Sequence, residues 1–283
     1  MYVVRSPAPA LSPFIEHYWF VRAPDAGFDL SVDVFVEARA DLIFNYGAAY
    51  HRTSRGQTVL HHAPNLDAQR DHPIRIRQVG AVHVVGVRFR VGGLAPFLAV
   101  PARSLTNQTP APERAFGPCV TPLVEALAAL DPDACAARLD AWFTAALRSD
   151  ASVQTFTRAK DLLLKQPSAT VEGVAVDVGV SARHLDRLFA QHLGLSPKVL
   201  ARVVRFQAAL QWLRSETRPG ADGRRLAPDA PLADVAHACG YYDQSHFTRE
   251  LRRFTGSPPR DLRRFYPEDA PTDFAPNVIR YQS

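Results

Sequence analysis

The sequence predicts an α+β protein of two domains, with a β-rich N-terminal domain and an all-α C-terminal domain. Three observations predict this fold class. The first hundred residues contain short segments rich in β-branched and aromatic residues, separated by Gly, Pro and Asn. From Ser152 to Phe265 the apolar residues follow helical spacing, and no convincing strand is found. A chain of 283 residues is also long enough to bury two separate cores.

Residues 1–118 are expected to form a barrel or sandwich of short strands. Residues 31–36 alternate between polar and apolar side chains, as a half-buried strand does. Residues 42–46 and 82–91 are rich in β-branched and aromatic side chains. Residues 11–19 instead fit a helical turn or two, because their apolar positions are 11, 14, 15, 18 and 19.

Residues 119–150 are expected to form a helical hairpin. Leu123, Leu127 and Leu130 lie on one face of its first helix, and Leu139 and Phe143 lie on one face of its second. Between the two helices, Asp131 is the expected N-cap and Pro132 the first helical residue. Such a hairpin either mediates dimerisation or covers the N-terminal core, and the sequence favours neither.

The C-terminal domain, residues 151–266, is expected to be entirely helical. Its polar stretch 216–230, rich in Gly and Pro, predicts a flexible loop, and residues 267–283 predict an extended tail. The expected helices span residues 152–165, 171–177, 182–192, 197–215, 231–238, 244–254 and 259–265.

The excess positive charge is confined to the helical domain. Residues 151–266 contain 18 Lys and Arg against 11 Asp and Glu, whereas residues 1–150 contain 14 of each. This asymmetry fits a segment that binds a polyanion, although a solvated basic face would look the same. No apolar run approaches the length of about 18 residues that crosses a bilayer, and no secretory signal is evident, so a cytoplasmic protein is expected. Cys119, Cys135 and Cys239 are too scattered for a disulfide framework or a zinc knuckle.

An internal repeat within the helical domain is the most informative feature. Residues 174–197 and 235–259 match almost residue for residue, with an offset of 61 up to a shared glycine and 62 beyond it. In each copy a small residue, Ala175 or Ala236, allows close helix crossing. A glycine then reverses the chain, and Ser181 or Asp243 caps the next helix. These are the parts of a helix-turn-helix, present twice.

The helix after each turn is amphipathic, as DNA recognition helices are. Its apolar residues are expected to face inward, and its polar face carries donor-rich side chains in the first two turns, where a major-groove helix contacts bases and phosphates. The inward residues are Leu185, Leu188 and Phe189 in the first copy, and Phe247, Leu251 and Phe254 in the second.

These motifs resemble the AraC/XylS family of transcription regulators. The resemblance is carried by YYDQSHFTR at 241–249, TGSPP at 255–259, SARHLDRLF at 181–189, GLSP at 194–197 and RFQAAL at 205–210. It covers about 115 residues and implies two helix-turn-helix subdomains joined by one long helix, here Pro197 to Leu213 with Ser196 as its cap. The loop from Glu216 to Ala230 is longer than the family pattern, which leaves the relative placement of the two recognition helices open.

The N-terminal half resembles, more weakly, the domain attached to some members of this family. LSPFIEHYW at 11–19, DLIFN at 41–45 and GVRFRVGG at 86–93 carry this resemblance. It implies a cupin-like β-barrel that senses a small molecule or mediates dimerisation. The whole resemblance implies a sequence-specific regulator of promoter DNA. It allows a small-molecule effector and a homodimer, and implies contact with RNA polymerase if the protein is an activator.

Arg187 and Arg249 occupy equivalent positions and are the first candidates for direct DNA contact. His184 and His246 are also equivalent, and capping or packing roles are as plausible for them as base contact. The full set of DNA-binding candidates is Ser181, Ala182, Arg183, His184, Arg187, Asp243, Gln244, Ser245, His246 and Arg249. Candidates for contacts to the DNA backbone are Arg202, Arg205, Arg252 and Arg253.

Aromatic residues of the N-terminal half are candidates for an apolar ligand cavity, although such residues more often form core. They are Trp19, Phe35, Phe44, Tyr46 and Phe89. Six histidines lie in this half, but their spacing does not predict a metal site, and no cofactor is expected. No catalytic constellation is evident in residues 1–110, so we expect no enzyme activity. The two competing hypotheses are an enzyme tethered to DNA and an N-terminal module that makes only protein contacts.

Overall fold

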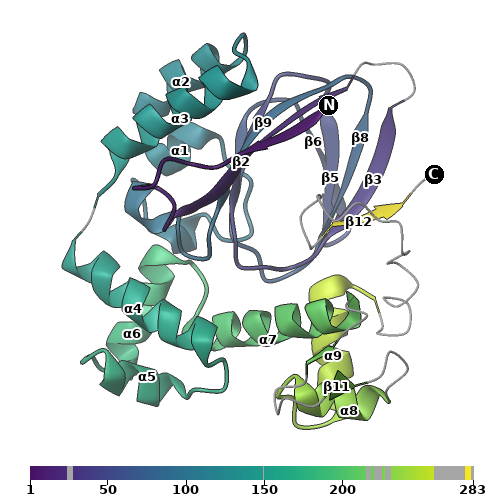
Figure 1. Cartoon of the computed structure of the whole chain (residues 1–283), viewed down its shortest axis with the longest axis vertical. Helices are drawn as coiled ribbons and strands as arrows, with labels where there is room; N and C mark the ends of the chain where they lie inside the picture. Colours follow the sequence, from purple (N-terminus) through teal and green to yellow (C-terminus); the bar gives the residue numbers. More distant parts are fainter. Residues whose placement is uncertain are drawn as a thin grey trace.

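The computed structural model describes residues 1–23, 28–148, 150–214, 218–219, 225–226, 231–257 and 278–281. Within these residues the strands of the N-terminal region and one strand near the C-terminus form two five-stranded antiparallel sheets (Figure 1). The first sheet has the order β1-β2-β9-β4-β7, with strands Tyr2–Arg5, Ile15–Ala23, Val82–Phe89, Asp41–Asn45 and Asn65–Asp67. The second has the order β12-β3-β8-β5-β6, with strands Val278–Tyr281, Asp29–Val34, Ile74–Val79, Tyr50–Ser54 and Gln57–His61.

The expectation of a β-rich N-terminal region is confirmed, but the strands form two sheets and not a closed barrel. The helical interpretation of residues 11–19 was wrong from Ile15 onward. Residues 9–14 form turns, and β2 then pairs with β9, Tyr18 lying opposite Val87 and Phe20 opposite Val85. The apolar spacing was misleading because Tyr18 and Phe20 point into the core while Leu11 reaches it from the preceding turn.

The helical hairpin covers the first sheet. It consists of α2 (Thr121–Leu127) and α3 (Pro132–Ala146), and Asp131 caps α3 by accepting hydrogen bonds from the Asp133 and Ala134 amides. Leu123, Leu139 and Phe143 are buried in one cluster with β2, β4 and β9 side chains. The sequence left open whether the hairpin mediates dimerisation or covers the N-terminal core, and this contact shows that it covers the core. Short helical segments η1 (Ala95–Phe97), η2 (Ala102–Ser104), α1 (Pro112–Phe116) and η3 (Pro118–Val120) precede the hairpin.

The C-terminal region is helical as expected, with one exception. Its helices are α4 (Ala151–Lys165), α5 (Val171–Asp177), α6 (Ala182–His192), α7 (Pro197–Arg214), α8 (Leu232–Ala238) and α9 (Gln244–Thr255). The expected absence of strands was wrong, because β10 (Arg218–Pro219) and β11 (Arg225–Leu226) pair within the predicted loop. The expected helix at 259–265 lies outside the described residues. In the expected extended tail, β12 pairs with β3.

The two regions share a buried interface. Figure 1 shows α7 passing beneath the sheets, from the helices α4, α5 and α6 to the pair α8 and α9. Phe35 and Val36 of the N-terminal region are buried in the same cluster as Phe206 and Phe254. The side chain of Gln207 donates to the Val36 carbonyl at 2.5 Å. The segment after β3 therefore contacts both α7 and α9.

Candidate nucleic-acid interface

The two predicted turns have the same backbone hydrogen bonds. In the first, the Val180 amide donates to Ala175 O at 2.9 Å; in the second, the Tyr241 amide donates to Ala236 O at the same distance. Gly179 and Gly240 adopt φ angles of 76° and 74°, in the left-handed region that favours glycine. The repeat seen in the sequence is therefore a repeat of three-dimensional structure.

Both predicted recognition helices, α6 and α9, begin at the predicted caps. Ser181 Oγ accepts from the His184 amide at 3.2 Å, and Asp243 Oδ1 accepts from the His246 amide at 2.6 Å. Ser196 caps α7 in the same way, through the Val199 amide. A cap satisfies backbone donors that would otherwise lack partners at the helix N-terminus. The cap assignments made from the sequence are confirmed.

Each recognition helix buries its apolar face and exposes its polar face. All six residues expected to point inward are buried. Arg183 and Arg187 are exposed on α6, as are Gln244, Ser245 and Arg249 on α9, together with Arg252 and Arg253 further along. The first two turns of both helices therefore present donors to solvent, as a major-groove reader requires. DNA contact by these residues stays a prediction.

Arg202 and Arg205, expected as phosphate contacts, make protein contacts that tie α7 to the second module. Arg202 forms a bidentate pair with Glu250 of α9, with Nε–Oε2 at 2.7 Å and Nη2–Oε1 at 2.5 Å. Burial disfavours the Glu250 carboxylate, but its hydrogen bonds to Arg202 outweigh that effect and the pKa of Glu250 lies below its usual range. Arg205 donates to the Gly240 carbonyl at 3.3 Å and lies over the Tyr241 ring. The two arginines thus hold the second turn and α9 against α7.

The contacts or exposure of three further residues near this surface were only partly indicated by the sequence. The His246 ring meets Tyr241 edge-on, with centroids 5.4 Å apart, so packing is one role of this histidine. Tyr242, immediately before the cap Asp243, is 89% exposed although it is aromatic. Glu250 was not singled out from the sequence. An acidic residue within the basic stretch 249–253 was the only available signal of its pairing.

The aromatic ligand candidates do not surround one cavity. Phe44 and Phe89 lie in the core beneath the hairpin, whereas Phe35 packs against Phe206 at the interface with the C-terminal region. Tyr46 donates to the Val124 carbonyl at 2.5 Å, and Trp19 lies across Gly86 of the neighbouring strand. Core packing therefore accounts for Phe44 and Phe89, and the other three are held at separate places.

A family model described as a helix-turn-helix domain matches residues 174–264, which contain both repeats. A second model, described as a domain of unknown function (DUF6597), matches residues 4–111. The HTH-type transcriptional regulator GbdR from Pseudomonas aeruginosa is 31% identical over 106 residues, which are 38% of this chain and 26% of that protein. The HTH-type transcriptional activator RhaS from Salmonella arizonae is 32% identical over 92 residues, covering 32% and 29%. The C-terminal region is therefore similar to the helix-turn-helix region of AraC/XylS-type transcription regulators.

Two solved structures are similar to parts of this chain. A transcriptional regulator from Chromobacterium violaceum, titled as containing an AraC-type DNA-binding domain, is 26% identical, with 43% of this chain and 100% of that chain covered and a TM-score of 0.35. ToxT from Vibrio cholerae is 7% identical, with 87% and 97% covered and a TM-score of 0.43. This chain spans about a quarter of the length of the curated relatives named above.

Outside the helix-turn-helix region, a buried charge cluster lies on the face of β9 opposite the hairpin. Arg88 is buried and pairs with Glu37 and with Asp41, at 2.9 Å in the second case. The two carboxylates raise the pKa of Arg88. Burial raises the pKa of Asp41 from 3.8 to about 6, because the charge of Arg88 offsets only part of it. One cation between two carboxylates therefore favours a proton on Asp41.

The Asp41 carboxyl is expected to make stability depend on pH. Between about pH 4 and pH 6, Asp41 keeps its proton in the folded state and loses it in the unfolded chain. The contribution of Asp41 to the free energy of unfolding therefore falls as pH rises through that window. Asp41→Asn should therefore gain stability relative to wild type from pH 4 to pH 6, by at most about 3 kcal/mol. Urea unfolding of both proteins at several pH values measures this difference.

Asp29→Asn is the matched control for the Asp41 experiment. The hydrogen bond and charge of Arg77 lower the pKa of Asp29 on an exposed face, so its stabilising contribution should be lost, not gained, as pH falls. A constant stability difference for Asp41→Asn across the window would show that Asp41 stays ionised in the fold.

In the part of the chain that the structure describes, no group of three or more His, Cys, Asp or Glu could hold a metal ion. No helix among the same residues is both long and apolar enough to span a membrane.

Proposed function

We propose that this chain is a sequence-specific DNA-binding transcription regulator that places α6 and α9 in successive major-groove segments of promoter DNA. The observation that carries the proposal is the duplicated turn, in which each recognition helix is capped, buries its apolar face and exposes an arginine at the same position. Two recognition helices on one chain fit two half-sites about one helical turn, or about 34 Å, apart. The match of residues 174–264 to a helix-turn-helix domain model supports the same assignment.

The positive charge of the helical region supports DNA as the partner. Residues 151–266 carry a net charge of +7. Basic side chains displace condensed counterions from the phosphates, which supplies a sequence-independent part of the affinity. A basic face that only contacts solvent could have the same charge, but it would not account for the duplicated capped turn.

We propose that the N-terminal region makes the regulator responsive to a small molecule, without catalysing a reaction. Its buried contacts with α7 and α9 give a ligand a physical route to the second module. The relatives named RhaS are described as transcriptional activators. If this chain also activates, RNA polymerase is a further partner. We also propose that the protein acts in the cytoplasm as a homodimer.

Arg187→Ala and Arg249→Ala are each expected to weaken binding to the specific site by about 1–3 kcal/mol if the two arginines contact bases. Both side chains are exposed on the polar face of their helices, so their removal leaves the buried contacts intact. Fluorescence anisotropy with a promoter fragment selected by the wild-type protein gives the affinities.

Arg158→Ala on α4 removes an exposed positive charge that lies on neither recognition helix and is the matched control. Competitor DNA of unrelated sequence separates base contacts from phosphate contacts, because loss of a phosphate contact weakens binding to both DNAs alike. Wild-type affinity in both Arg187→Ala and Arg249→Ala would refute the proposed recognition helices.

A further inference from the structure

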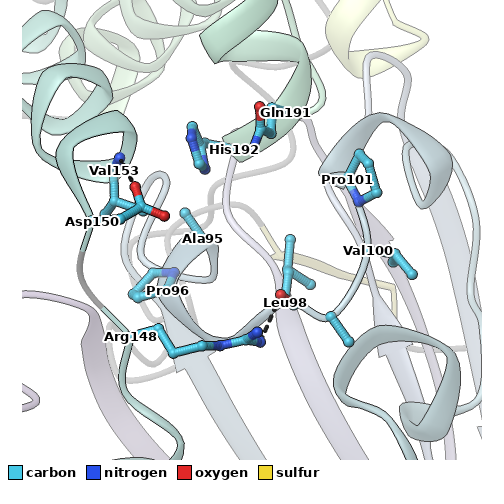
Figure 2. A pocket seen from close by; sticks show the side chains of 11 residues that line it. Ala95, Pro96, Leu98, Val100, Pro101, Arg148, Asp150, Val153, Gln191 and His192 are labelled. Atoms are coloured by element: carbon cyan, nitrogen blue, oxygen red, sulfur yellow. Dashed lines mark hydrogen bonds between the residues drawn. The ribbon is translucent and has the colours of Figure 1, made fainter.

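A cavity of about 250 Å³ lies between the N-terminal region and the first recognition helix. Figure 2 shows that its lining comes from residues 95–101, from Arg148, Asp150 and Val153, and from Gln191 and His192 in the last turn of α6. Leu98, Val100 and Val153 supply apolar surface, and Arg148, Asp150 and His192 supply polar groups.

His192 is a buried polar group in the wall of the cavity. It is 5% exposed, its Nε2 lies 2.9 Å from Ser152 Oγ, and its ring packs against Phe156. Among the described residues, only its Nε2 has a hydrogen-bond partner, and burial lowers the pKa of the ring. The Nδ1 atom is therefore available to water or to a ligand.

Arg148 and Asp150 place opposite charges at the same cavity. Arg148 uses one terminal nitrogen, Nη2, to donate to Phe97 O at 3.2 Å and Leu98 O at 2.7 Å, so its remaining donors are available. Asp150 uses Oδ1 for the N-cap of α4, where it accepts from Ser152 and Val153, which leaves Oδ2. Figure 2 shows both side chains at the cavity, with Arg148 reaching Leu98.

We propose that this cavity binds an apolar α-amino acid, whose carboxylate pairs with Arg148 and whose ammonium group pairs with Asp150 Oδ2. The apolar side chain lies against Leu98, Val100 and Val153. One positive and one negative group favour a zwitterion over an anion or a cation. The cavity volume is below the roughly 300–1,000 Å³ of sites for drug-sized ligands. It therefore favours a ligand as small as an amino acid.

A ligand in this position would join the last turn of α6 to the N-terminal region. The same turn already contacts that region, because Thr106 Oγ1 donates to the Gly194 carbonyl at 2.9 Å immediately beyond α6. A bound amino acid therefore adds a second connection and biases the placement of the first module. This regulatory consequence rests on the proposed function, whereas binding of the amino acid does not.

Calorimetry on the full-length protein tests the ligand class with L-leucine, L-valine, L-methionine and L-phenylalanine as probes. We expect at least one to bind, and its N-acetyl derivative and its amide to bind at least about tenfold more weakly, because each loses one charged hydrogen bond. Absence of binding by all four amino acids at millimolar concentrations would overturn the proposal. Equal binding of the N-acetyl derivative would overturn the pairing with Asp150.

Asp150→Asn tests the same pairing in the protein. Asn is also a good N-cap, so the variant keeps α4 intact while it removes the charge. We expect affinity for the amino acid to fall about tenfold or more and the discrimination against the N-acetyl derivative to disappear. Asp131→Asn, which alters the equivalent cap of α3 away from the cavity, should bind as wild type does. If Asp150→Asn retains full affinity and discrimination, the assignment is wrong.

A DNA titration with and without the amino acid separates this inference from the proposed function. If the amino acid binds and shifts the affinity for the promoter fragment, both hold. If the protein binds the promoter fragment but none of the amino acids, only the cavity assignment fails. If it binds an amino acid but no DNA, only the proposed function fails.

Discussion

Arg202→Ala is expected to lower the free energy of unfolding by about 3–5 kcal/mol, because it leaves the Glu250 carboxylate buried without its cation. Glu250 is 7% exposed, and both of its oxygens accept from the Arg202 guanidinium. The pair joins α7 to α9, so the loss should also disturb the placement of the second recognition helix. Equilibrium urea unfolding followed by circular dichroism measures the stability.

The double variant Arg202→Met/Glu250→Leu is the decisive companion to that experiment. Replacing both members of a buried ion pair by apolar side chains is often neutral or stabilising, whereas removing one member is costly. We therefore expect the double variant to recover most of the stability that Arg202→Ala loses. Arg252→Ala, an exposed position on the same helix, should change stability by less than about 0.5 kcal/mol. A loss below about 1 kcal/mol in Arg202→Ala would mean that water solvates Glu250.

The local parts of the C-terminal region could be predicted from the sequence because local interactions determine them. A cap such as Ser181 satisfies the amide three residues later, and Gly179 adopts a backbone angle that other residues avoid. Both depend on neighbours within a few positions. The repeat of these signals at 235–259 made the prediction specific, since one copy alone is a common pattern.

The contacts between distant segments could not be predicted, because nothing local specifies them. Arg202 and Glu250 are 48 residues apart, and Gln207 and Val36 are 171 residues apart. An arginine that contacts phosphate and one that pairs with a buried glutamate look alike in a sequence. The helical interpretation of 11–19 failed for the same reason. The partner strand β9, some 70 residues later, decides that Tyr18 belongs to a sheet.

Phe206 of α7 lies where the N-terminal region, the long helix and the second module meet. Its side chain is fully buried, and its ring centroid lies 6.5 Å from Phe35 and 5.1 Å from Phe254. Removing a buried phenyl ring costs its transfer free energy and leaves a cavity that surrounding groups fill only in part. Phe206→Ala is therefore expected to lower the free energy of unfolding by about 3–5 kcal/mol.

The position of Phe206 predicts which part of the molecule loses protection. Because the ring packs on both regions, Phe206→Ala should increase amide hydrogen exchange in α7, in α9 and in the segment around Phe35 together. Phe143→Ala, an equally buried ring beneath the hairpin, should cost a similar free energy but increase exchange mainly in α3 and the first sheet. Mass spectrometry of peptides from both variants measures the two patterns. If Phe206→Ala left exchange around Phe35 unchanged, the contact with the N-terminal region would contribute little, and a ligand there would have no route to α9 through this core.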